Sequence, residues 1–108
     1  MCAGSQDKFW QMHDSLFKNQ DKWAKGGNPQ QVFESLAQSV GVKMDDWKSC
    51  VASHAPRMMI EGDFAKTTHA GIEGTPSFII GNELSVVGAA PYAKFKEAID
   101  AALAKAGK

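Results

Sequence analysis

Apolar side chains recur at three- and four-residue spacing through the first two-thirds of the chain, which is the pattern of amphipathic helices. It predicts helices over residues 6–19, 29–40, about 45–54 and about 56–69. The second is marked most clearly, because Asn28 is an N-cap residue type and the proline that follows it suits the first helical position. Each of these helices needs another element to cover its apolar face.

The pattern changes at Gly71, where short β-prone runs replace the helical spacing. Residues 77–81 form an apolar strand, Gly81-Asn82 is typical of a tight turn, and residues 84–87 can return antiparallel. Pro91 then begins a last helix. Its apolar face is formed by Phe95, Ala98, Ile99, Ala102 and Leu103.

The predicted order is therefore four helices, a hairpin and a helix, which is an α+β arrangement. At 108 residues the chain has the length of one domain. We expect residues from 1 to about 70 to form a helical part and residues from about 71 to 108 to form a β-β-α unit. No repeat or linker indicates a second domain.

The charge balance limits the classes of partner. Twelve basic and twelve acidic residues cancel, and no long run of like charge favours nucleic acid or an anionic membrane. No apolar run approaches the length of about 20 residues that spans a bilayer. The N-terminus does not show the basic-then-apolar pattern of a signal peptide.

The two cysteines, Cys2 and Cys50, are too few for a zinc site and do not form a C-x-x-C pair. They allow one disulfide or two free thiols. Cys2 also begins a C-x-x-S sequence before a helix, where a helix N-terminus would lower a thiol pKa. Since no strand precedes it, we favour the structural disulfide over a monothiol redox site.

The remaining chemically versatile side chains are predicted to be structural. The histidines fall on different predicted helices without the spacing of metal ligands, so no metal or cofactor is expected. Helical spacing places His13 on an apolar face, and tryptophan and methionine at such spacing usually belong to the core. The residues concerned are His13, His54, His69, Trp10, Trp23, Trp47 and the run 58–60.

Three blocks near the C-terminus, GTPSFIIGN (74–82), VGAAPY (87–92) and FKEAID (95–100), resemble the last third of a DsbA-like thiol-disulfide oxidoreductase. The opening CAGSQDKFW (2–10) is similar to the start of the helical insertion of that family. The resemblance implies a thioredoxin-like fold and a periplasmic or secreted location, where a disulfide between Cys2 and Cys50 is permitted.

The resemblance also implies a missing part. In that family a strand, a C-x-x-C motif and a second strand precede the helical insertion, whereas this chain begins at Met1-Cys2. We therefore expect a truncated domain, assign no catalytic residue, and expect the isolated chain to be inactive in thiol-disulfide exchange, which needs a thiolate and a resolving cysteine.

The Gly74-Thr75-Pro76 sequence is the candidate binding site. In the family that it resembles, the equivalent proline is cis, and the backbone at the position of Thr75 pairs with an extended substrate peptide. The plain alternative is a loop that ends before a strand, because proline is tolerated at the first residue of a strand.

Two functions remain open on this sequence. The chain could belong to an oxidoreductase whose N-terminal unit lies in cis or on another polypeptide. It could instead be a non-catalytic module that binds itself or an extended peptide through a sheet edge. We expect a homodimer in which the strands Ser77 to Gly81 pair antiparallel, the alternative being a monomer whose helical segment covers that edge.

Overall fold

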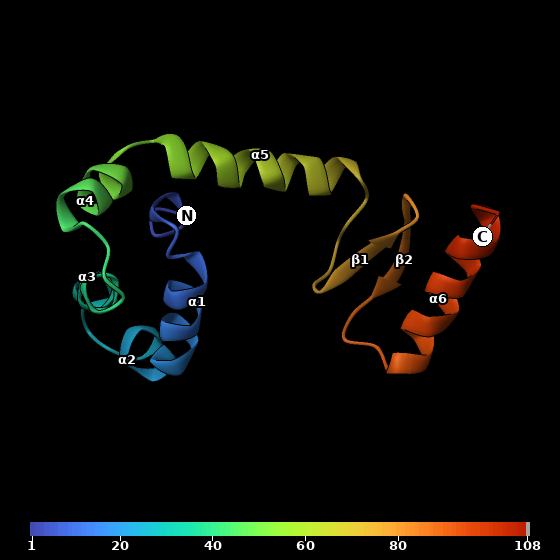
Figure 1. Ribbon diagram of the computed structural model, residues 1–108, viewed down its shortest axis with the longest axis horizontal. Helices are drawn as coiled ribbons and strands as arrows, with labels where there is room; N and C mark the ends of the chain where they lie inside the picture. Colours follow the sequence, from blue (N-terminus) through green and yellow to red (C-terminus); the bar gives the residue numbers. More distant parts are fainter. Residues whose placement is uncertain (108) are drawn as a thin grey trace. The chain divides into compact units, whose positions relative to one another are not determined.

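The computed structural model describes residues 1–107, and its elements are labelled in Figure 1. In chain order they are the 3-10 helix η1 (Gly4–Gln6), α1 (Phe9–Lys18), α2 (Gln20–Ala24), α3 (Pro29–Ser39), α4 (Met44–Ala52), α5 (Ala55–His69), β1 (Ser77–Ile80), β2 (Glu83–Val87) and α6 (Tyr92–Lys105). The chain divides into two compact units, Met1–Glu61 and Gly62–Lys108. The division falls within α5, earlier than the change of pattern at Gly71.

The first unit is helical, and α3 packs against α1, α2 and α4. Its core is small because few side chains are withdrawn from water. The buried residues of the core cluster are Cys2, Ala3, Ala37, Val42 and Trp47, and the partly buried residues packed against them are Met12, Phe33, Val40, Met44 and Cys50.

Two long-range ties hold the N-terminal segment in this core. Cys2 and Cys50 form a disulfide with a Cα–Cα distance of 5.7 Å. The Gln6 side chain bonds the backbone of Lys43 twice: its Nε2 donates to the Lys43 carbonyl at 3.2 Å, and its Oε1 accepts from the Lys43 amide at 2.7 Å. The segment before α1 is thereby fixed beside the start of α4.

The local signals for α3 are confirmed. The side chain of Asn28 accepts a hydrogen bond from the Gln31 amide at 3.2 Å, and Pro29 is the first helical residue. Gly41, after the C-terminus of α3, has φ +86°, which only glycine adopts without strain. Leu36 and Ala37 are the buried residues of its apolar stripe.

The prediction for the first helix was wrong at its start and missed an element. Asp7 adopts a left-handed φ of 58° and separates η1 from α1, so the regular helix begins at Phe9 rather than Gln6. The short helix α2 was not predicted. Its Trp23 donates from Nε1 to the Leu16 carbonyl at 2.8 Å, a bond that the sequence spacing does not reveal.

Several residues predicted to be in the core are exposed. His13 is partly exposed and lies 3.0 Å from the Asp14 carboxylate, beside Phe9 and Phe17. Trp10 is 68% exposed. Residues 58–60 are also exposed, whereas Trp47 is buried as predicted. No described element covers these side chains.

In the second unit, β1 and β2 form an antiparallel hairpin. The turn residues Gly81 and Asn82 both have positive φ, 60° and 69°, as a type I′ turn requires. Figure 1 shows α6 beside the hairpin, and the contact includes the Phe78 and Phe95 rings, 4.8 Å apart at 88°. The element content is α+β, as predicted.

Both cysteines are predicted to be oxidised in solution, because the described chain contains no free cysteine. Thiol titration of the unfolded, non-reduced chain should find no reactive thiol. Finding two thiols per chain would contradict the disulfide.

The disulfide should contribute strongly to the stability of the first unit. It closes a loop with a sequence separation of 48, for which the chain-entropy model gives about 4 kcal/mol as an upper value. All three tryptophans lie in this unit, so urea unfolding followed by tryptophan fluorescence reports it selectively. The double variant Cys2→Ser/Cys50→Ser should unfold at lower urea, and the reduced parent chain should match it. Coincident unfolding curves for the parent chain and the variant would contradict the contribution.

Candidate functional site

The Gly74-Thr75-Pro76 loop leads directly into β1, and the Thr75–Pro76 peptide bond is cis. Thr75 and Pro76 are exposed. Two hydrogen bonds hold the loop in place. The Ser77 hydroxyl donates to the Gly74 carbonyl, and the Gly88 amide donates to the Pro76 carbonyl at 2.7 Å.

The hydrogen-bond pattern of the hairpin decides which backbone groups of β1 are free. In an antiparallel pair, the residues that exchange hydrogen bonds alternate with residues whose amide and carbonyl point away from the partner strand. The bond from Gly88 to Pro76 and the closing pair Ile80–Glu83 set this alternation from both ends of β1. The N–H and C=O groups of Ser77 and Ile79 therefore point toward the outer edge.

That outer edge has no strand beside it within the described residues, where the sheet consists of β1 and β2 alone. A free edge of this kind can bind an extended peptide, with backbone hydrogen bonds giving affinity and side-chain pockets giving specificity. The loop and the edge form one continuous candidate site. The sequence analysis named its Gly74, Thr75 and Pro76, and the structure adds Ser77 and Ile79.

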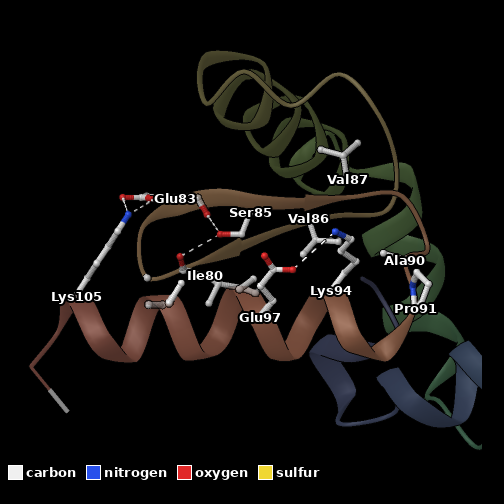
Figure 2. Close-up of a pocket in the computed structure, with 14 residues that line it drawn as sticks. Ile80, Glu83, Ser85, Val86, Val87, Ala90, Pro91, Lys94, Glu97 and Lys105 are labelled. Carbon is white, nitrogen blue, oxygen red and sulfur yellow. Dashed lines mark hydrogen bonds and ion pairs between the residues drawn. The ribbon is translucent and has the colours of Figure 1, made fainter.

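The two faces of the hairpin differ. Phe78, Ile80 and Val86 lie on the side of α6, and Val86 is buried. Figure 2 shows Val86 and Ile80 directed toward α6 and Val87 directed away from it. The open face carries Ile79, Leu84 and Val87, which are 53%, 42% and 62% exposed. The candidate site thus borders an exposed apolar surface.

A groove of about 660 Å³ lies between the hairpin and α6 (Figure 2). Its charged side chains are paired: Lys105 bonds Glu83 at 2.9 Å, and Lys94 lies 3.7 Å from Glu97. The Lys105–Glu83 pair joins residues 22 positions apart and could not be read from helical spacing. Since these charges neutralise one another, the groove does not favour a charged ligand of either sign.

One lysine on α6 has a shifted pKa. Lys96 donates to the Asp100 carboxylate one turn later, and this hydrogen bond raises the pKa of the Lys96 ammonium. Both side chains are exposed, so the pair is a surface ion pair. Among residues 1–107, no group of three or more His, Cys, Asp or Glu is arranged to hold a metal ion.

The cysteines lie in the other unit from the loop. Cys2 is 7% exposed and its sulfur is bonded to that of Cys50, so neither sulfur is a thiol in this structure. The cysteine of the C-x-x-S sequence is thus part of a disulfide. The first unit also contains an apolar groove of about 1220 Å³, which the sequence analysis did not predict and which Met12, Trp23, Phe33 and Trp47 help to line.

A family model described as thioredoxin matches residues 1–101. The chain belongs to the thioredoxin family. This confirms the thioredoxin-like resemblance that the C-terminal blocks and the opening sequence suggested. In this family member, the described residues form no helix that is long and apolar enough to cross a membrane.

Curated relatives of this thioredoxin-family chain are named after a redox activity. A Rickettsia bellii protein named "Putative protein-disulfide oxidoreductase" is 28% identical over 80 residues, which cover 73% of this chain and 31% of that protein. A Rickettsia felis protein of the same name is 28% identical over 81 residues, covering 73% and 29%. The chain therefore spans about a third of the length of these relatives. No solved structure matches the chain significantly.

Proposed function

We propose that this chain is the polypeptide-binding part of a DsbA-type protein-disulfide oxidoreductase. The Gly74-Thr75-Pro76 loop and the outer edge of β1 bind an extended stretch of the substrate polypeptide. The observation that carries the proposal is the pair of outward-facing residues, Ser77 and Ile79, placed immediately after the loop. The family match and the names of the relatives support the redox class.

The exchange chemistry needs thiols that these residues do not supply. A thiolate attacks one sulfur of a disulfide, the sulfur–sulfur bond breaks, and a second thiol resolves the mixed disulfide. The only cysteines of the sequence are Cys2 and Cys50, which are bonded to each other and do not form a C-x-x-C pair. In our proposal, a C-x-x-C segment elsewhere in the polypeptide, or on another chain, performs the exchange.

A disulfide in the first unit also suits an oxidising compartment, since disulfides form and persist in the periplasm and outside the cell. We therefore place the protein in the periplasm or among secreted proteins.

The isolated chain should not reduce insulin disulfides faster than the small-thiol background. Both of its sulfurs are in the Cys2–Cys50 disulfide, so no thiolate is available to begin exchange. Insulin turbidity with glutathione as the reductant measures this, and the Cys2→Ser/Cys50→Ser variant is the control. Turnover that the double substitution removes would contradict the assignment and give Cys2 or Cys50 a catalytic role.

Peptide binding should depend on the outer edge of β1. Ile79→Pro deletes an outward amide and obstructs the edge, and it should weaken binding of a labelled, carboxamidomethylated insulin B chain by about tenfold, the equivalent of 1.4 kcal/mol. Leu84→Pro is the matched control, because Leu84 is the cross-strand partner of Ile79 and belongs to the other strand.

Fluorescence anisotropy measures the binding, and circular dichroism checks that both variants keep the fold. Equal affinity of the parent chain and Ile79→Pro would contradict the binding site. Equal weakening by both proline variants would show that the loss comes from a damaged hairpin and would remove the support for the edge.

A non-catalytic peptide-binding module is the second candidate, favoured by the bonded state of both cysteines. The binding surface is the same in the two cases, so binding does not separate them. The nucleotide sequence upstream of the Met1 codon gives a test, because a strand followed by C-x-x-C encoded there would favour the oxidoreductase.

A further inference from the structure

The backbone amide of Thr75 is a hydrogen-bond donor that the folded chain does not use. Thr75 is exposed, and its N–H has no acceptor among residues 1–107. The next residue, Pro76, has no backbone N–H. The Thr75 amide is therefore the last backbone donor before β1, and it is free to bond a ligand.

A hydroxyl at the start of β1 sets the direction of this amide. The Ser77 hydroxyl donates to the Gly74 carbonyl, a bond that spans Thr75. The Gly74 carbonyl and the Thr75 N–H belong to one planar peptide group, which is trans, because Thr75–Pro76 is the only cis bond within residues 1–107. In a trans peptide the two groups point in opposite directions. The Thr75 N–H is therefore directed away from the Ser77 side chain.

Glycine at position 74 makes this hydrogen bond necessary. A glycine backbone has the widest choice of conformations, so the peptide group that follows it rotates unless something holds it. Packing does not confine it, because a Cβ built on Gly74 would make only an ordinary contact, 3.7 Å from the Val87 Cγ1. At the other end of the loop, the Gly88 amide holds the Pro76 carbonyl at 2.7 Å. The Ser77 hydroxyl thus fixes the half of the loop that Gly88 does not reach.

We infer that Ser77 is a positioning residue, whose hydroxyl holds the Gly74–Thr75 peptide group so that the Thr75 N–H is presented to the bound polypeptide. The bond is partly shielded from water, which strengthens it. This role rests on the proposed function, since it concerns the loop that binds the polypeptide. It needs no partner strand beside β1.

Peptide binding tests the role with a matched pair of variants. Ser77→Thr and Ser77→Val introduce side chains of nearly the same shape, both suited to a strand, and only threonine has the hydroxyl. Ser77→Val should raise the dissociation constant of the labelled, carboxamidomethylated insulin B chain by about three- to tenfold, the range expected for one lost hydrogen bond. Ser77→Thr should stay within about twofold of the parent chain.

Ser85→Ala is a second control. It removes from β2 a hydroxyl that donates to the Glu83 carbonyl at 3.0 Å, which is the same kind of bond in the same hairpin. Since this bond does not reach the Gly74-Thr75-Pro76 loop, the affinity of Ser85→Ala for the peptide should equal that of the parent chain.

Amide chemical shifts of the ligand-free chain separate positioning from a general loosening of the hairpin. In Ser77→Val the Thr75 amide signal should move, because its peptide group has lost the bond to the carbonyl, and in Ser77→Thr it should return toward its parent position. The signals of Ile80 and Glu83, the pair that closes the hairpin, should stay unchanged in both variants. Movement of these two signals as large as that of Thr75 would show a damaged hairpin and overturn the inference.

The outcomes distinguish this role from the proposed function. A parent chain that does not bind the insulin B chain would overturn both. A parent chain that binds no better than Ser77→Val would overturn the positioning role alone. Equal weakening by Ser77→Thr and Ser77→Val would also overturn it, because the hydroxyl would then play no part.

Discussion

The two-residue turn at Gly81 and Asn82 is the constraint on which the second unit depends. Both residues have positive φ, which glycine and asparagine tolerate best. A Cβ on Gly81 would also lie 3.0 Å from the Ala102 Cβ, a tight contact that glycine avoids where the turn approaches α6. The turn fixes Ile80 opposite Glu83, and the alternation along β1 then directs Ser77 and Ile79 to the outer edge.

The first unit is stabilised by different interactions. Few of its side chains are buried, and a small core gives a small hydrophobic contribution. The Cys2–Cys50 disulfide and the paired bonds between Gln6 and Lys43 both fasten the N-terminal segment to the region of α4. Small domains in oxidising compartments commonly use disulfides in this way. In this unit, the disulfide thus fixes the N-terminal segment beside α4.

Local signals in the sequence predicted most of the secondary structure. Asn28 caps α3, Gly41 follows the end of this helix, and Gly81-Asn82 forms the turn of the hairpin. Each of these signals acts on residues close to it in the chain, so it can be recognised in the sequence alone. Long-range contacts were not predictable in this way. The Gln6–Lys43 bonds and the Lys105–Glu83 ion pair join residues from separate elements, and no periodicity reports which side chains of different elements meet.

Burial was the weakest part of the prediction for a related reason. Helical spacing shows which residues share a face of a helix, but it does not show whether another element covers that face. Trp47 is covered and Trp10 is not, although both were predicted to belong to the core. The candidate site was predicted in part, because Gly74-Thr75-Pro76 is recognisable in sequence. The contribution of Ser77 and Ile79 depends on the register of the hairpin, which is a property of the fold.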